Sequence, residues 1–126
     1  MTQYWEAKTA KRYDRYSHLA MAAAKTAMAD GNLDADSVNG KRFGVLIGSG
    51  VGGLESVETS CRILFDKGPK RISPFLLPSI IGNTAGSMVA IELGAKGPNY
   101  GVVCLAPERC YHSLTHHAEL IPTCVA

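Results

Sequence analysis

The stretch Gly44–Gly53, GVLIGSGVGG, is the part of the sequence whose residue types and spacing point most directly to chemistry. Gly48, Gly50 and Gly53 match the pattern G-x-G-x-x-G. In dinucleotide-binding proteins this pattern forms a tight turn after a buried strand, where the backbone approaches a pyrophosphate and a helix N-terminus faces it. A dinucleotide site is therefore the first hypothesis for this turn.

The spacing after the turn argues against that hypothesis. The acidic residue of the pattern would be Asp66, after a second strand at residues 63–65. Between Leu54 and Cys61 there is room for only about two helical turns, whereas a crossover between parallel strands needs about a dozen residues. A single helix over residues 54–67 explains the segment better, because five apolar side chains would share one face. These five are Leu54, Val57, Cys61, Leu64 and Phe65.

A second group of candidate residues lies near the end of the sequence, where cysteines and histidines cluster. Thiolates and imidazoles are the side chains that zinc prefers, so a zinc site is one hypothesis for this segment, although the spacing matches no standard zinc motif. Its ligands would come from Cys104, Cys110, His112, His116, His117 and Cys124. We expect the remaining cysteine, Cys61, to be a buried structural thiol, which indicates a reducing compartment.

The composition indicates one soluble globular domain, with 46% hydrophobic and 19% charged residues in 126. The net charge of +2, without a stripe of basic residues, argues against nucleic acid as a partner. No apolar run approaches the roughly 20 residues of a membrane span. The polar N-terminus contains acids, so we expect no targeting segment and a cytoplasmic location, or a plastid or mitochondrial one.

A local basic cluster consists of Lys67, Lys70 and Arg71. We expect it to be solvated surface; the alternative is a docking patch for an acidic partner.

The elements that must position the glycine turn alternate between helices and strands. The periodicity predicts a helix over residues 9–30, a strand over 43–47 and, after the helix at 54–67, a proline-rich loop with at most short helical turns. A helix over 84–93, capped by Asn83, and a strand over 100–105 follow. The apolar stripe expected on the first helix, with His18 beside it as a packing residue, comprises Tyr13, Tyr16, Leu19, Ala20, Ala23, Ala24 and Ala27. This order predicts an α/β layered fold.

Three blocks of the sequence, in matching order and spacing, resemble the N-terminal half of the β-ketoacyl-acyl carrier protein synthases. The blocks are GVLIGSGVGGLE, KGPKRISPFLLPSIIGNTAG and IELGAKGPNYGVV, and the AKRYDRYSHLAMAAAKTA segment resembles the family's early helix. The resemblance covers about residues 8–103. It implies a partial thiolase-like α/β fold with an incomplete sheet, a homodimer partner and an acyl carrier protein partner. The implied reaction is a decarboxylative condensation in fatty acid elongation, in which a malonyl-derived carbanion attacks a cysteine-bound acyl chain without a metal or organic cofactor.

The same resemblance implies roles for three apolar residues. Val51 corresponds to a side chain that limits how far the acyl chain penetrates. Phe75 and Leu76 correspond to residues that line the acyl pocket near the dimer interface. Ordinary core packing is the alternative for all three.

The catalytic pattern of the family is broken in this sequence. In the family, G-P-N-Y is followed by three residues and then by a turn, T/S-A-C-A, where a helix N-terminus lowers the pKa of the cysteine. Here the position of the nucleophile holds Ala106, and the nearest thiol, Cys104, comes two residues early. The two histidines of the family lie further along than these 126 residues reach. We therefore expect the chain by itself to be inactive.

We divide the chain into a partial thiolase-like region, residues 1–103, and a divergent tail, residues 104–126, which is either frameshifted, derived from a retained intron, disordered, or genuine sequence of another kind. The expected function is that of a fragment of a 3-oxoacyl-[acyl-carrier-protein] synthase, an acyltransferase. Two alternatives remain from other classes. One is a dimer-partner or regulatory binding module that pairs with a full-length synthase, and the other is a dinucleotide-binding domain.

Overall fold

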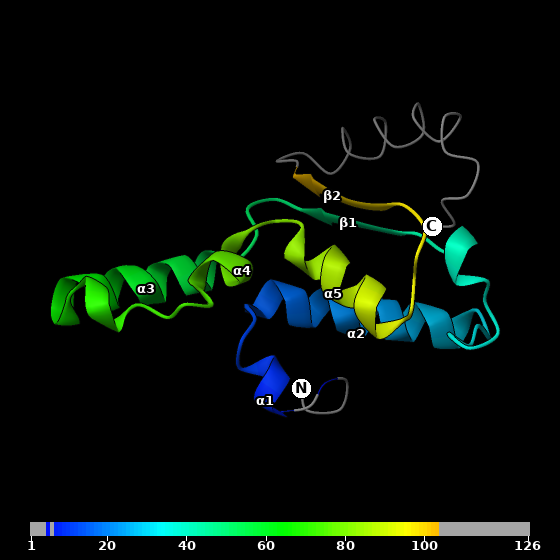
Figure 1. Cartoon of the computed structure of the whole chain (residues 1–126), viewed down its shortest axis with the longest axis horizontal. Coiled ribbons are helices and arrows are strands. Elements are labelled where there is room, and N and C mark those ends of the chain that lie inside the picture. The colour runs from blue at the N-terminus through cyan, green and yellow to red at the C-terminus, as the bar shows by residue number, and fades with distance from the viewer. Residues whose placement is uncertain (1–4, 6, 104–126) are drawn as a thin grey trace.

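The structure, a computed structural model, describes Trp5 and residues 7–103 of the chain. Two strands lie over helix α5, helix α2 lies behind α5, and helix α3 extends away to one side with α4 beside its base (Figure 1). The elements are α1 (Ala7–Ala10), α2 (Arg15–Asp30), the 3₁₀ turn η1 (Gly40–Arg42), β1 (Val45–Ser49), α3 (Leu54–Lys67), the 3₁₀ turn η2 (Pro69–Arg71), α4 (Leu76–Ile80), α5 (Thr84–Glu92) and β2 (Asn99–Val103).

The strands β1 and β2 form a parallel pair, with Val45 opposite Asn99 and Ser49 opposite Val103. Parallel neighbours require a long crossover connection, which here contains α3, α4 and α5. Helix α5 packs against both strands and also against α2. The expected partial α/β fold with an incomplete sheet is thus confirmed for the described residues.

The core lies where α2, α5 and β1 meet. Six buried apolar residues form it: Trp5, Met21, Val45, Val89, Ala90 and Leu93. The Trp5 ring also packs nearly perpendicular to the ring of His18, with 5.6 Å between the ring centroids. Removal of this apolar surface from water is the main term that stabilises so small a unit.

The expectation of one helix over residues 9–30 is wrong. The helix is interrupted between α1 and α2, because the Asp14 carboxylate accepts a hydrogen bond from the Tyr16 N–H and begins a new helix. The expected apolar stripe faces the core only in part, because Tyr13 and Ala24 pack against it whereas most of the other alanines do not. Instead, Ser17 and Met21 are buried, whereas Leu19 is 55% exposed.

The other expected elements are confirmed with small shifts. Helix α3 has the predicted bounds, α5 ends one residue early, and β1 begins two residues later than expected. Asn83 precedes α5, but its side chain makes no capping hydrogen bond.

The expected burial of helix α3 is wrong. Cys61 is exposed, and none of the 14 residues of α3 is buried within the described part of the chain. The predicted apolar face therefore exists but is uncovered here. No helix in the described ranges is long and apolar enough to cross a membrane.

Candidate functional site

The glycine turn after β1 packs directly on the backbone of α4. A Cβ atom at Gly53 would lie 2.9 Å from the carbonyl carbon of Ser79 and would overlap its oxygen. Gly52 adopts a φ of +80°, which glycine tolerates best, and a Cβ there would overlap the carbonyl oxygen of Ile80. The absence of side chains at these glycines thus allows the backbone of α4 to approach the turn closely.

Two N–H groups of this turn donate hydrogen bonds within the protein. The Gly53 N–H donates to the carbonyl oxygen of Ile80 at 3.2 Å, and the Gly52 N–H donates to Ser49 Oγ at 3.0 Å. A pyrophosphate site needs such N–H groups to point at the ligand. The residues that the dinucleotide hypothesis needed as a second strand, 63–65, lie inside helix α3. The dinucleotide hypothesis is therefore wrong, because N–H groups of the turn bond within the protein and the second strand it requires is part of a helix.

The carboxylate of Asp14 occupies the N-terminus of α3. Its Oδ2 accepts a hydrogen bond from the Ser56 N–H at 2.7 Å, and its Oδ1 accepts one from the Tyr16 N–H of α2 at 3.3 Å. Asp14 is only 6% exposed. One negative charge therefore serves the positive ends of two helices, which favours both. The aspartate before α2 is a sequence signal for a helix start, but nothing local predicts its contact with α3, 42 residues away.

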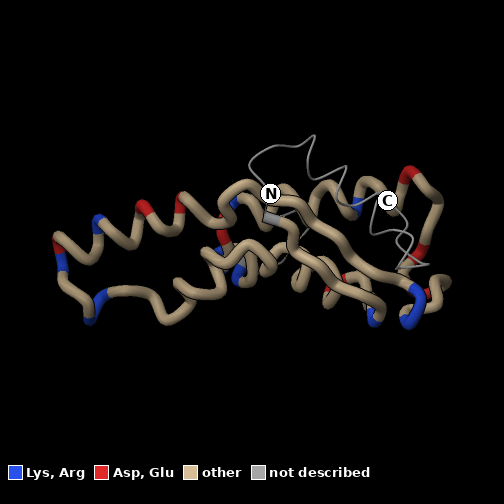
Figure 2. The backbone as a smooth tube through the Cα atoms, turned by 90° about the horizontal axis from the view of Figure 1, so that it is seen from above, with Lys and Arg blue, Asp and Glu red and all other residues tan. Residues whose placement is uncertain are grey.

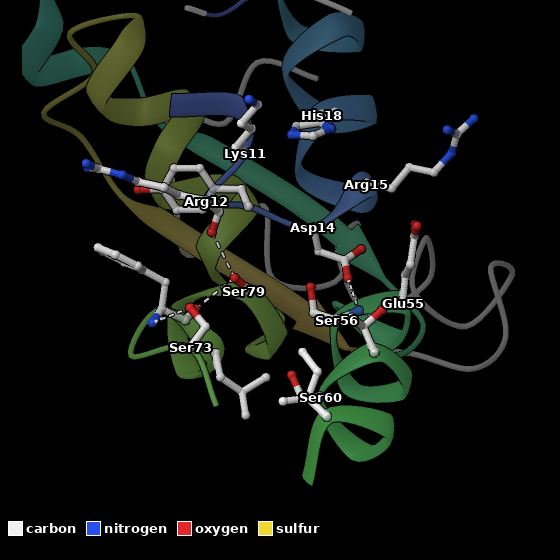
Figure 3. Close-up of a pocket in the computed structure, with 15 residues that line it drawn as sticks. Lys11, Arg12, Asp14, Arg15, His18, Glu55, Ser56, Ser60, Ser73 and Ser79 are labelled. Atoms are coloured by element: carbon white, nitrogen blue, oxygen red, sulfur yellow. Dashed lines mark hydrogen bonds between the residues drawn. The ribbon is translucent and has the colours of Figure 1, made fainter. Parts of the chain in front are cut away.

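A hollow of about 430 Å³ lies beside Asp14 (Figure 3). It is bounded by the link between α1 and α2, the first half of α3, and α4. Arg12 stacks over the ring of Phe75, with 5.0 Å from the guanidinium carbon to the ring centroid. The lining also includes Lys11, Arg15, His18, Glu55, Ser56, Thr59, Ser60, Ile63, Ser73, Leu76 and Ser79.

Ser79 connects two walls of this hollow. Its hydroxyl lies 2.8 Å from the carbonyl oxygen of Arg12 and 2.7 Å from that of Phe75, within donating distance of both. The Tyr16 hydroxyl donates to the carbonyl oxygen of Ile81, just after α4. The segment around residues 12–16 therefore holds α4 as well as α3.

Residues 2–104 match the family model described as "Beta-ketoacyl synthase, N-terminal domain". The chain belongs to this family. It is 49% identical over 98 residues to a 3-oxoacyl-[acyl-carrier-protein] synthase 2 of Synechocystis sp., and this match covers 78% of the chain and 24% of the relative. It is 47% identical over 96 residues to the synthase 2 of Staphylococcus aureus, a match that covers 76% of the chain and 24% of the relative. The chain thus spans 24% of the length of these curated relatives and corresponds to a fragment of a condensing enzyme.

A solved structure shares the fold of this β-ketoacyl synthase fragment. It is a type II PKS acyl-carrier protein in complex with its ketosynthase bound to the hexaketide. The match has a TM-score of 0.67 and 20% sequence identity, and covers 75% of this chain and 28% of the other. The resemblance inferred from three sequence blocks and the thiolase-like fold class are thereby confirmed.

The structure brings together two of the three residues that we assign to the acyl pocket. Phe75 and Leu76 both line the hollow beside Asp14. Val51 stands 61% exposed on the glycine turn and does not belong to that lining. Their role toward an acyl chain stays a prediction for this synthase fragment.

The residues discussed for the nucleophile position and for zinc fall outside the described residues. Ala106 holds the expected nucleophile position, Cys104 is the nearest thiol, and the zinc hypothesis uses the cysteines and histidines from 104 to 124. Within the described part of the chain, no three His, Cys, Asp or Glu side chains lie close enough together to hold a metal ion. His18 Nε2 donates a hydrogen bond to the carbonyl oxygen of Ala10 at 2.8 Å. The side chain is thus held by a contact within the protein, in line with the expected packing role.

Proposed function

We propose that this chain contributes acyl-chain and carrier-protein contacts to a β-ketoacyl-[acyl-carrier-protein] synthase, and that it does not itself form the acyl thioester. The observation that carries the proposal is the packing of the glycine turn on α4. In a chain of this family, that packing makes the turn part of the scaffold around Val51, Phe75 and Leu76. The reaction served is acyl transfer followed by decarboxylative condensation.

The cysteine content supports the second half of the proposal. Acyl transfer requires a thiolate at a sharp turn before a helix, where the N-terminus of the helix favours the negative charge. Cys61, the one cysteine within the described residues, lies in the middle of α3. We assign the family's nucleophile position to Ala106, which carries no thiol.

A basic cluster at the far end of the α3 arm supports the carrier-protein contact. Lys67, Lys70 and Arg71 are exposed there, and Figure 2 shows the basic positions at the tip of the arm. Lys67 and Arg71 line a hollow together with Ile63. An acidic partner would be attracted to such a cluster, and the attraction would weaken as salt screens it.

The proposal is tested by titrating the full chain with acyl carrier protein and recording the affinity by calorimetry. We expect the double variant Lys70→Glu, Arg71→Glu to bind at least about tenfold more weakly than the wild type. The matched control is Lys41→Glu, Arg42→Glu, which reverses two exposed charges in η1. Equal affinity for all three proteins, or no binding by the wild type, would refute the carrier-protein contact.

A second candidate function is that of a binding module for another synthase chain. The uncovered apolar face of α3 favours it, because Phe65 is 85% exposed and Leu54 is 60% exposed. We expect the wild type to co-purify with a full-length synthase and the variant Phe65→Asp to lose this association. The control Asp66→Ala changes an exposed neighbour on the polar side of the helix. A chain that stays monomeric alone and in the mixture would contradict this candidate.

A further inference from the structure

Helix α3 begins at a residue that cannot cap it. Gly53 occupies the N-cap position, and a glycine has no side chain to accept the first N–H groups of the helix. Any larger residue would collide with the backbone of Ser79 in α4. Because α4 approaches so closely, the N-cap position cannot hold a side chain that caps the helix. An acceptor for the first N–H groups of α3 must therefore come from another part of the chain.

Asp14 supplies that acceptor from a distant part of the chain. Its carboxylate lies 2.7 Å from the Ser56 N–H, which belongs to the third residue of α3. The other oxygen caps α2, so the side chain is fixed from both directions. In Figure 3 the Asp14 side chain points toward Ser56 at the start of α3.

Residues 12–16, the segment that carries Asp14, also hold α4 in place. The carbonyl oxygen of Arg12 lies within hydrogen-bond distance of Ser79 Oγ, and the Arg12 guanidinium stacks on Phe75. Ser79 is in turn the residue whose backbone meets Gly53. Residues 12–16 thus contact the first turn of α3, which directly follows the glycine turn with Val51, and also contact α4, whose start carries Phe75.

We propose that Asp14 is a positioning residue, which fixes the glycine turn against α4 and thereby sets the placement of Val51 relative to Phe75 and Leu76. The effect of Asp14 on the binding of acyl chains rests on the proposed function, whereas its effect on the position of the glycine turn is independent of that function. The carboxylate acts through the N–H of Ser56 and needs no contact with the acyl chain.

The first arm of the test measures amide hydrogen exchange in the full chain by NMR. In the variant Asp14→Ala we expect exchange at Ser56 and at the turn residues 50–53 to rise by about tenfold or more, while exchange in α5 and β1 changes little. Asp14→Asn keeps an oxygen that can accept from Ser56, so it should restore much of the protection. Asp30→Ala, at the exposed end of α2, is the control. Unchanged exchange at Ser56, or a uniform rise throughout the chain, would overturn the proposal.

The second arm titrates the same proteins with a short-chain and a long-chain acyl pantetheine thioester and follows the methyl signals of Val51 and Leu76. We expect Asp14→Ala to alter the preference between the two thioesters and Asp14→Asn to resemble the wild type. If the wild type binds neither thioester, the proposed acyl contacts fail, and the exchange arm decides the positioning role by itself. If Asp14→Ala does not fold, Asp14→Ser takes its place, because serine can still cap α2 but lacks the second oxygen that accepts from Ser56. A local rise in exchange at Ser56 and residues 50–53 then supports the proposal, and no rise or a uniform one overturns it.

Discussion

The backbone of Ser79 lies so close to Gly53 that even one methyl group at the glycine would overlap the serine carbonyl oxygen. The contact joins α4 to the start of α3, and the Gly53 N–H adds a hydrogen bond to Ile80. The glycine pattern, which in the sequence suggests a phosphate site, therefore serves in the fold to let the turn pack against α4.

This contact predicts a large effect for Gly53→Ala. We expect the free energy of unfolding to fall by about 3 kcal/mol, because the methyl group must push α4 or the turn aside. Urea denaturation followed by circular dichroism measures the change. Gly48→Ala is the matched control, since nothing lies within 4 Å of a Cβ at that position. Equal stability of the two variants would contradict the packing role of Gly53.

Ser17 gives a prediction of the opposite sign. It is buried in α2, and its hydroxyl has no hydrogen-bond partner within the described residues. Ser17→Ala removes a buried polar group without losing a bond, so stability should stay equal or rise by up to about 1 kcal/mol. Ser87→Ala, by comparison, deletes a hydroxyl that donates to the carbonyl oxygen of Asn83. A loss of more than about 1 kcal/mol in Ser17→Ala would mean that the hydroxyl has a partner.

The ion pair between Lys25 and Glu92 joins α2 to α5, with 2.6 Å between Nζ and Oε1. Both side chains are partly exposed, so solvent and salt weaken the attraction. We expect Glu92→Gln to lower the stability by less than about 1 kcal/mol, and the difference from wild type to shrink in high salt. Thermal denaturation at two salt concentrations checks this. A difference that is independent of salt would show that charge is not its cause.

The Tyr16 hydroxyl donates to the carbonyl oxygen of Ile81 and so ties α2 to the loop after α4. Tyr16→Phe removes the donor and keeps the ring, and we expect a loss of about 1 kcal/mol. Tyr100→Phe, at an exposed position in β2, is the control. If the two variants unfold at the same urea concentration, the Tyr16 bond contributes nothing to stability.

Local sequence patterns predict the elements of this fold well. The periodicity of Leu54–Lys67 and the glycine that follows it define α3, and the apolar runs define β1 and β2 to within about two residues. Local patterns cannot predict that Cys61 is exposed, because burial of an apolar face depends on what covers it. The resemblance to a family supplied Val51, Phe75 and Leu76.

The contacts that organise the site depend on distant segments. Asp14 and Ser56 are 42 residues apart, and Arg12 and Ser79 are 67 apart. An aspartate before a helix predicts a local cap, and only the three-dimensional structure shows that the same carboxylate caps a second helix. The glycine motif is ambiguous in sequence for the same reason, since both a phosphate and a backbone require the absence of a side chain.

The claim that the chain does not itself form the acyl thioester is tested most directly by an acyl-transfer experiment on the full chain. The purified protein is incubated with acyl-loaded carrier protein and its intact mass is measured, with a Cys61→Ser variant to exclude acylation of the exposed thiol. We predict that the mass of the chain does not change, because we assign the position of the attacking cysteine to Ala106, which has no thiol. A mass increase equal to one acyl group, retained in Cys61→Ser and located at Cys104 or another sulfur of the chain, would contradict this.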